Sequence, residues 1–240
     1  MPNTPIDSLV LLPGLLCDGS VWRFQVDALA KFALCTSVEW GTQDSLTAMA
    51  EKVLREAPAR FAVAGHSMGG RVALEVYRRA PERVRRIALL NSGYQARPRG
   101  AAGEEEEHGR LALLEIARTQ GMRAMALQWL PPMIHPERRT DSDLVEGIVE
   151  MFARKTPGIF AKQICAMLNR PDAEGVLQSI RCPALVLTGR EDEWSPPDRH
   201  EEMAARIPGS RLLLIPECGH MSLLERPEAV AKALQEWLTT

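Results

Sequence analysis

Six short apolar runs recur along the chain, and several alternate with stretches in which apolar residues return every three or four positions. The first pattern is typical of buried strands and the second of amphipathic helices. Strands that alternate with helices predict an α/β fold, in which helices cover a parallel sheet. The expected strands are Ser8–Leu12, Ala33–Glu39, Arg60–Ala64, Arg86–Leu90, Ala184–Thr188 and Arg211–Ile215.

Helical periodicity is clearest near the end of the sequence. Apolar residues there follow the spacing of one buried helix face, and Pro227 fits near the helix start. The residues on this face are Val230, Ala233, Leu234, Trp237 and Leu238. Three further helices are expected among the first strands, at Val21–Lys31, Leu46–Glu56 and Arg71–Arg79.

The strand–helix rhythm stops between residues 92 and 183. A linker rich in Gly, Pro, Ala and Arg, Gly93–Gly103, precedes the acidic run Glu104–Glu107, which we expect to form a solvated face. The pattern therefore predicts a core of residues 1–92 and 183–240, with a linker and an all-helical insert over the sheet at 93–182. Helices are expected in the insert at Leu111–Arg118, Met122–Trp129, Ser142–Phe152 and Gly158–Leu168.

Composition narrows the class of protein. The 240 residues suit one large domain or a core with an insert, and a net charge of −2 gives no basis for a nucleic-acid partner. The five cysteines contain no close pair, which argues against a disulfide framework or a zinc site. Cys182 and Cys218 are expected to be small buried residues. No run is long enough to span a membrane, and Ser8–Cys17 lacks the features of a signal peptide, so we expect a cytoplasmic protein.

The most informative motif is Gly65-His66-Ser67-Met68-Gly69-Gly70, at a junction between an expected strand and an expected helix. A serine flanked by glycines two positions away on either side is the signature of a nucleophile elbow. The tight reversal that lifts the serine hydroxyl leaves no room for side chains at positions 65 and 69. A glycine-rich turn that happens to contain serine is the alternative interpretation.

A nucleophilic serine needs a base, and the base needs a group that orients it. His220 lies just beyond the last strand, at the sheet edge that the elbow reaches, and is the expected general base. The elbow turns His66 away from Ser67, so packing is its expected role. Solvent-facing positions are expected for the other histidines, His108, His135 and His200.

Two places in such a sheet suit the acid, after the strand that follows the elbow or after the next strand. The first place holds Asn91-Ser92-Gly93 and no carboxylate, whereas the second holds Asp192, three residues beyond Gly189. Asp192 is therefore the expected acid. Its neighbours Glu191 and Glu193 are expected to point elsewhere, and Asp198 to lie in the first turn of a helix.

An oxyanion hole requires two backbone N–H groups that converge on one point. One is expected from Met68, the residue after the nucleophile. The second should come from the loop after the first strand, which begins at Pro13. We favour the amide of Leu15, with Leu16 as the alternative.

Together, Gly65–Gly70, Gly189–Asp192 and Gly219-His220, in the order Ser, Asp, His, resemble the α/β-hydrolase fold superfamily. The resemblance is strongest in residues 8–92 and 183–238. Within the superfamily the chain is most similar to small bacterial carboxylesterases of the pimeloyl-carrier-protein methyl esterase and enol-lactonase kind. This resemblance implies a helical cap, and a Ser67–Asp192–His220 triad that needs neither metal nor cofactor.

The chain departs from that pattern in two places. Many relatives carry His-Gly in the oxyanion loop, where this chain has Pro13-Gly14. Relatives also often begin with an antiparallel hairpin, but only seven residues precede Ser8. We therefore expect the hairpin to be missing or vestigial, which leaves about six strands, parallel throughout.

The function expected from these residues is hydrolysis of a small, apolar carboxylic ester through an acyl-enzyme. The same triad also serves carbon–carbon bond hydrolases and a menaquinone-pathway-type lyase, cofactor-free haloperoxidases or perhydrolases, and acyltransferases; a non-catalytic hydrolase-fold protein is a further alternative. Substrate contacts are expected from Leu16, Trp129, Met133 and Met221. The sequence does not select among Arg123, Arg154, Lys155 and Arg170 as a partner for a substrate carboxylate.

Overall fold

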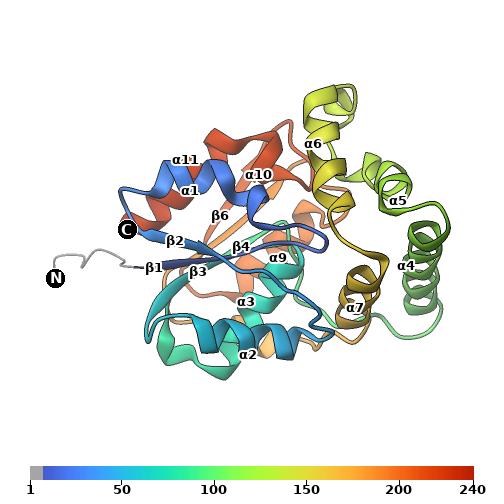
Figure 1. The fold of residues 1–240 in the computed structure, drawn as a ribbon. Coiled ribbons are helices and arrows are strands. Elements are labelled where there is room, and N and C mark those ends of the chain that lie inside the picture. Colours follow the sequence, from blue (N-terminus) through green and yellow to red (C-terminus); the bar gives the residue numbers. More distant parts are fainter. Residues whose placement is uncertain (1–7) are drawn as a thin grey trace.

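The computed structural model describes residues 8–240, and within this range six strands form one sheet (Figure 1). The strand order is β2-β1-β3-β4-β5-β6, and every neighbouring pair is parallel. The predicted fold class is therefore confirmed. The strands are β1 (Ser8–Leu12), β2 (Leu34–Ser37), β3 (Phe61–His66), β4 (Val84–Leu90), β5 (Ala184–Gly189) and β6 (Arg211–Ile215).

The strand at one edge of the sheet, β2, is shorter than its apolar run predicts. It pairs only with β1, in a register that runs from Ser8 opposite Leu34 to Leu11 opposite Ser37. Because β1 supplies only five residues, the ladder ends before the apolar run does. The predicted absence of an N-terminal hairpin concerns residues 1–7, which lie outside the described residues.

Helices cover both faces of the sheet (Figure 1). On one face, α1 (Arg23–Leu29) packs against α11 (Pro227–Thr239), which follows the short α10 (Ser222–Glu225). The other face carries α2, α3, α8 and α9, of which α3 contacts β1, β3 and β4. Their bounds are Leu46–Glu56 for α2, Met68–Arg79 for α3, Glu174–Ser179 for α8 and Pro197–Arg206 for α9.

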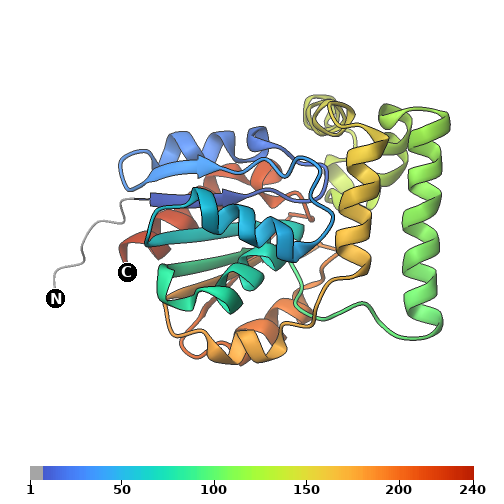
Figure 2. The same cartoon turned by 60° about the horizontal axis from the view of Figure 1, so that its bottom comes forward.

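Four more helices lie beyond the carboxyl ends of the strands (Figures 1 and 2). The helices predicted within residues 111–168 correspond to this group. The first observed helix begins ten residues earlier than predicted, so it includes the acidic run and the end of the predicted linker. The helices are α4 (Ala101–Thr119), α5 (Met122–Trp129), α6 (Ser142–Ala153) and α7 (Pro157–Leu168). Single 3₁₀ turns occur at Gly19–Trp22, Pro81–Arg83, Pro131–Met133 and Pro136–Arg138.

Three of the strands are buried along their whole length, because helices cover them on both sides. Every residue of β1, β3 and β5 is buried, as is typical of a parallel sheet. Between β1 and β3 the strand order reverses, so the chain leaves these two neighbours in opposite directions. Ligands of such sheets bind in the crevice at this point, outside the carboxyl ends of the strands.

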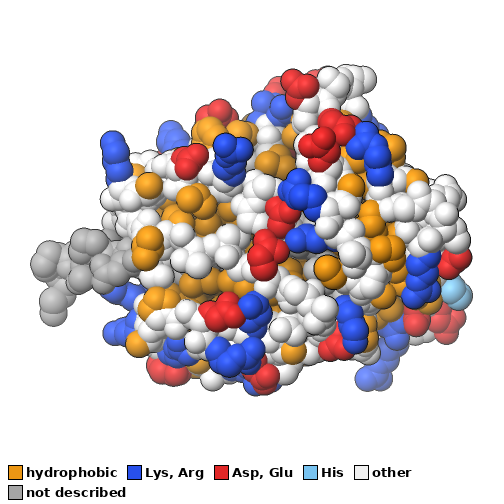
Figure 3. All heavy atoms as spheres, viewed as in Figure 1, with side chains coloured by type: hydrophobic (Ala, Val, Ile, Leu, Met, Phe, Trp, Pro, Cys, Tyr) orange, Lys and Arg blue, Asp and Glu red, His pale blue; other side chains and the backbone are white. Residues whose placement is uncertain are grey.

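On the face drawn in Figure 3, basic and acidic side chains are interspersed and do not form a region of one charge. Among residues 8–240, no helix combines the length and apolar character that crossing a membrane requires. All five cysteines fall in this range and are free thiols. Cys218 is buried as predicted, whereas Cys182 is only partly buried.

Candidate active site

The turn between β3 and α3 has the shape that the glycine pattern predicts. Ser67 has a φ of 54° and a ψ of −117°, an unfavourable backbone conformation for a residue with a side chain. A Cβ on Gly65 would lie 2.2 Å from the Gly69 carbonyl oxygen, and a Cβ on Gly69 would lie 2.0 Å from the carbonyl oxygen of Leu12. Only glycine fits at either position, so these two residues allow the turn that exposes the Ser67 hydroxyl.

The side chains of Ser67, His220 and Asp192 form one hydrogen-bonded series, although they are far apart in the sequence. His220 Nε2 lies 2.9 Å from Ser67 Oγ, and His220 Nδ1 lies 2.9 Å from Asp192 Oδ2. An ionised carboxylate only accepts hydrogen bonds, so Nδ1 carries the proton and Nε2 is free to accept from the serine hydroxyl. The structure thus brings together the three residues that the sequence selected for the triad.

Several further groups hold the Asp192 carboxylate in place. Its oxygens accept hydrogen bonds from the side chains of Asn91 and Thr188 and from the backbone N–H groups of Trp194 and Ser195. Burial alone would raise the pKa of Asp192, but the charge and hydrogen bond of His220, with the bonds from Asn91 and Ser195, lower it to about 2. Asp192 is therefore an anion at neutral pH.

The loop that carries His220 is fixed by two carboxylates and by the backbone of Met133. Glu225, a buried residue of α10, accepts hydrogen bonds from the backbone N–H groups of Gly219, Met221 and His135. Glu191 accepts from the Cys218 N–H, and the His220 N–H donates to the carbonyl of Met133. The sequence did not assign a role to Glu225, because its contacts are backbone groups with no signature of their own.

Two of the other histidines are buried within the described structure. His66 packs beside His220 and donates from Nε2 to the His220 carbonyl over 2.9 Å, in line with its predicted packing role. The prediction that His200 faces solvent is wrong, because its Nε2 accepts the Ser92 N–H in the protein interior. Burial is the main cause that lowers the pKa of His66 to about 3 and that of His200 to about 4.

The loop after β1 lies against the elbow, since a Cβ on Gly14 would be 3.3 Å from the Ser67 Cβ. The Leu16 N–H donates to Gln163 Oε1 of α7 over 2.8 Å, so this amide is already engaged. The amides of Met68 and Leu15 have no such partner among residues 8–240. Of the two loop amides that the sequence offered, Leu15 is thus the one left available.

A narrow cavity of about 30 Å³ adjoins Ser67 and His220. Its walls are largely apolar and include three of the predicted contact residues, Trp129, Met133 and Met221. Leu16, the fourth, is fully buried and does not line this space.

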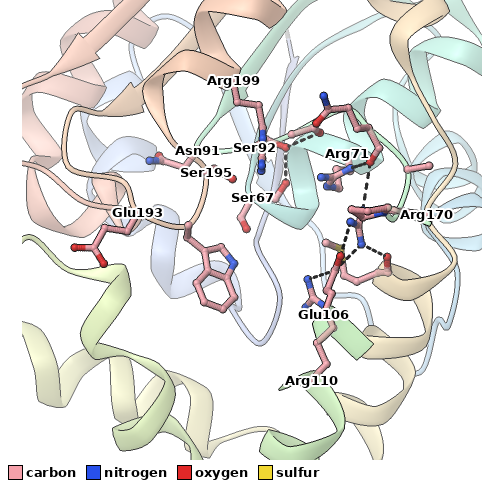
Figure 4. A pocket seen from close by; sticks show the side chains of 16 residues that line it. Ser67, Arg71, Asn91, Ser92, Glu106, Arg110, Arg170, Glu193, Ser195 and Arg199 are labelled. Atoms are coloured by element: carbon pink, nitrogen blue, oxygen red, sulfur yellow. Dashed lines mark hydrogen bonds and ion pairs between the residues drawn. The ribbon is translucent and has the colours of Figure 1, made fainter. Parts of the chain in front are cut away.

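A larger cavity of about 340 Å³ also adjoins Ser67, and most of the residues that line it are polar (Figure 4). Four arginines reach it, of which only Arg170 was among the cations named from the sequence; the others are Arg71, Arg110 and Arg199. The remaining predicted cations are engaged elsewhere: Arg123 with Glu146, Arg154 with Asp18 and Lys155 with Glu39.

The predicted solvated face at residues 104–107 is wrong for Glu106. Its carboxylate is partly buried and binds the Arg170 guanidinium through both oxygens, at 2.7 Å each, while Arg110 binds one of them. Burial alone would raise the pKa of Glu106, but these arginines lower it to about 2.

Within the described residues, no three His, Cys, Asp or Glu side chains are grouped to hold a metal ion.

Residues 9–233 match the alpha/beta hydrolase family, and the chain belongs to this family of hydrolases. It is 27% identical over 246 residues to a pimeloyl-[acyl-carrier protein] methyl ester esterase of Nitrosomonas europaea, an alignment that covers 92% of this chain and 91% of that one. Among solved structures it is similar to a thermophilic esterase from Thermogutta terrifontis, with 27% identity, a TM-score of 0.84 and coverage of 97% and 89%. It is also similar to the enol-lactonase of Burkholderia xenovorans LB400, with 25% identity, a TM-score of 0.82 and coverage of 98% and 92%.

Proposed function

We propose that this protein hydrolyses a carboxylic ester, with Ser67 as the nucleophile, His220 as the general base and Asp192 as the acid that orients it. The observation that carries the proposal is the unbroken series from Ser67 Oγ through the His220 ring to Asp192, with both bonds at 2.9 Å. The esterase and lactonase names of similar proteins support ester chemistry in general.

The reaction begins when Ser67 Oγ attacks the ester carbonyl carbon and its proton passes to His220 Nε2. The carbonyl oxygen becomes an anion, which the N–H groups of Met68 and Leu15 stabilise. His220 then gives the proton to the departing alcohol oxygen as the C–O bond breaks, leaving an acyl group on Ser67. Water attacks this acyl-enzyme, again losing its proton to His220, and the acid is released as Ser67 recovers its hydrogen.

Asp192 stabilises the imidazolium that forms in each half of the reaction. It stays ionised because the groups around it keep its pKa far below neutrality. Its hydrogen bond to Nδ1 also fixes the tautomer in which Nε2 is the acceptor.

Residues 93–182 act in this proposal as a linker and a cap over the Ser67 site. Helices α4–α7 lie beyond the carboxyl ends of the strands (Figure 2). Ser67 directly follows the carboxyl end of β3. Trp129 and Phe152 of this region line the narrow cavity, and Met133 bonds the loop of His220. The small apolar cavity suits a short acyl or alcohol group next to the reacting carbonyl.

Replacing the nucleophile tests the assignment. We expect Ser67→Ala to lower kcat for p-nitrophenyl acetate by roughly 10³-fold or more, because the members of a triad act as a unit. A fluorophosphonate probe should label the unmodified protein at Ser67, as located by peptide mass spectrometry, and should not label the variant.

Ser142→Ala is the matched control, since Ser142 is exposed at the start of α6. It should retain both the activity and the probe labelling. Esterase activity that survives in folded Ser67→Ala would refute the proposal.

A further inference from the structure

The polar cavity beside Ser67 contains more positive than negative charge (Figure 4). Arg110 and Arg170 share the single carboxylate of Glu106. Glu193, the other acidic residue of the lining, points away from the arginines in Figure 4 and pairs with Arg139 outside the cavity. One internal carboxylate therefore faces four guanidinium groups.

Of the four arginines that line this cavity, Arg71 and Arg199 have no carboxylate partner among residues 8–240. Arg71 donates to the Gln95 carbonyl, and the Arg199 guanidinium has no hydrogen bond to any of these residues. The two side chains lie against the same residue: a Cβ on Gly93 would be 2.6 Å from Arg71 Nη2 and 3.3 Å from Arg199 Cδ. They thus converge on one wall of the cavity, with several N–H donors left unused.

Neither arginine is freely hydrated, since both are partly buried. Burial and the charges of Arg170 and Arg199 lower the pKa of Arg71. Removing a charged group from water without a counter-ion is unfavourable, and an anion between the guanidinium groups would offset this cost. The cavity is therefore electrostatically suited to an anion that arrives from outside the chain.

We infer that Arg71 and Arg199 bind a carboxylate carried by the ester substrate, so that the preferred substrate is a half ester of a dicarboxylic acid. The inference rests on the proposed function of Ser67, whose side chain lines the same cavity. Arg71 lies four residues after Ser67 on α3, a rise of about 6 Å along the helix. The carboxylate would thus bind close to the reacting ester.

A carboxylate fits this pair better than a neutral polar group does. A planar guanidinium donates two parallel hydrogen bonds to the two oxygens of a carboxylate, and such charge-assisted bonds are stronger than bonds between neutral groups. The volume of about 340 Å³ leaves room for a short carbon chain between the carboxylate and the ester.

The test compares monomethyl glutarate with dimethyl glutarate, which has the same chain but no charge. We expect kcat/KM to be about tenfold or more higher for the half ester. Arg199→Gln should remove most of this preference by raising KM for the half ester, while hydrolysis of the dimethyl ester stays within about twofold of the unmodified protein.

Arg123→Gln removes the same charge from an exposed ion pair between α5 and α6 and should leave the preference intact. Equal rates on both esters in the unmodified protein, or equal losses on both in Arg199→Gln, would overturn the inference, although Ser67-dependent hydrolysis would still support the proposed function.

Binding without turnover gives a second readout, which holds even if neither ester is cleaved. Calorimetry of Ser67→Ala with glutarate should show binding that the added change Arg199→Gln weakens about tenfold. No binding at millimolar glutarate would overturn the inference. Equally tight binding of inorganic phosphate would contradict a site that selects carboxylates.

Discussion

At the scale of single residues, the position of His220 depends on a carboxylate that takes no part in the chemistry. Glu225 is 1% exposed and accepts the N–H groups of the residues on either side of His220, as well as that of His135. Burial raises the pKa of Glu225, whereas these backbone bonds lower it and offset part of that effect. Glu225 is therefore a positioning residue for His220, the base of the proposed reaction.

Glu225→Gln tests this role with a change of almost no volume. The amide replaces one acceptor oxygen by a donor, which then faces a backbone N–H and leaves it unpaired. We expect kcat for p-nitrophenyl acetate to fall about 10- to 100-fold with little change in KM, and stability to fall by about 1–3 kcal/mol. Steady-state turnover assays measure the change in kcat and KM, and urea unfolding measures the change in stability. A variant that is less stable but has normal kcat would show that Glu225 supports the fold alone.

At the scale of elements, the loop after β1 is tied to helix α7 by one buried hydrogen bond. Gln163 of α7 accepts the N–H of Leu16, 147 residues away in the sequence, over 2.8 Å. The φ of Leu16 is 62°, a left-handed conformation that a leucine rarely adopts. This bond helps to hold the strained turn, and with it the orientation of the neighbouring Leu15 amide.

Gln163→Leu removes the acceptor and keeps a similar volume. The Leu16 N–H would remain buried without a partner, at a cost of about 1–3 kcal/mol, and the turn would relax. We expect kcat to fall about tenfold, because the Leu15 amide would no longer be held toward Ser67. The matched control is Lys162→Ala, the exposed neighbour on the same helix, which should keep normal kcat. Normal kcat in folded Gln163→Leu would contradict the link from α7 to the oxyanion loop.

The elements that sequence reasoning located best are those with a strong local pattern. The apolar runs of β1 and β6 match the observed strand bounds, and the glycines around Ser67 predict the elbow from the sequence alone. In contrast, α8 is only six residues long, too short for a helical period to stand out.

The residues of the candidate site likewise fall into those with a local sequence pattern and those without one. Ser67, Asp192 and His220 each follow a strand end within a recognisable motif, so the sequence indicated them. Arg71 and Arg199 gave no such signal, because what distinguishes them is the lack of a carboxylate partner in three dimensions. Arg71 lies about one turn into the helix that follows the elbow, and Arg199 about one turn into the helix that follows the Asp192 loop. These positions are the signal that could have placed both arginines at the carboxyl edge of the sheet.

At the scale of the whole molecule, the parallel topology explains why distant segments meet at one place. The strand order reverses between β1 and β3, and the loops after β1, β3, β4, β5 and β6 all leave from the same end of the sheet (Figure 1). The end of α6 and helix α7 are joined to this end of the sheet by ion pairs, Arg154 with Asp18 and Lys162 with Asp44. The arrangement surrounds the site with protein and buries histidines that would otherwise take up protons.

This burial predicts how stability depends on pH. His200 is neutral in the folded protein down to about pH 4, whereas in the unfolded chain it takes up a proton below about 6.5. Between these values the unfolded state binds more protons, so the free energy of unfolding falls as the pH is lowered, by up to about 3 kcal/mol from this residue. His66, whose folded pKa is about 3, acts in the same direction, while the stability that Asp192 contributes is lost only below about pH 3.8.

Urea unfolding at a series of pH values from 7 to 4 should therefore show a declining midpoint, and His200→Gln should make the decline shallower. His108→Gln, a change at an exposed position of α4, should leave the slope as it is, and an unaltered slope in His200→Gln would mean that another group takes up the protons.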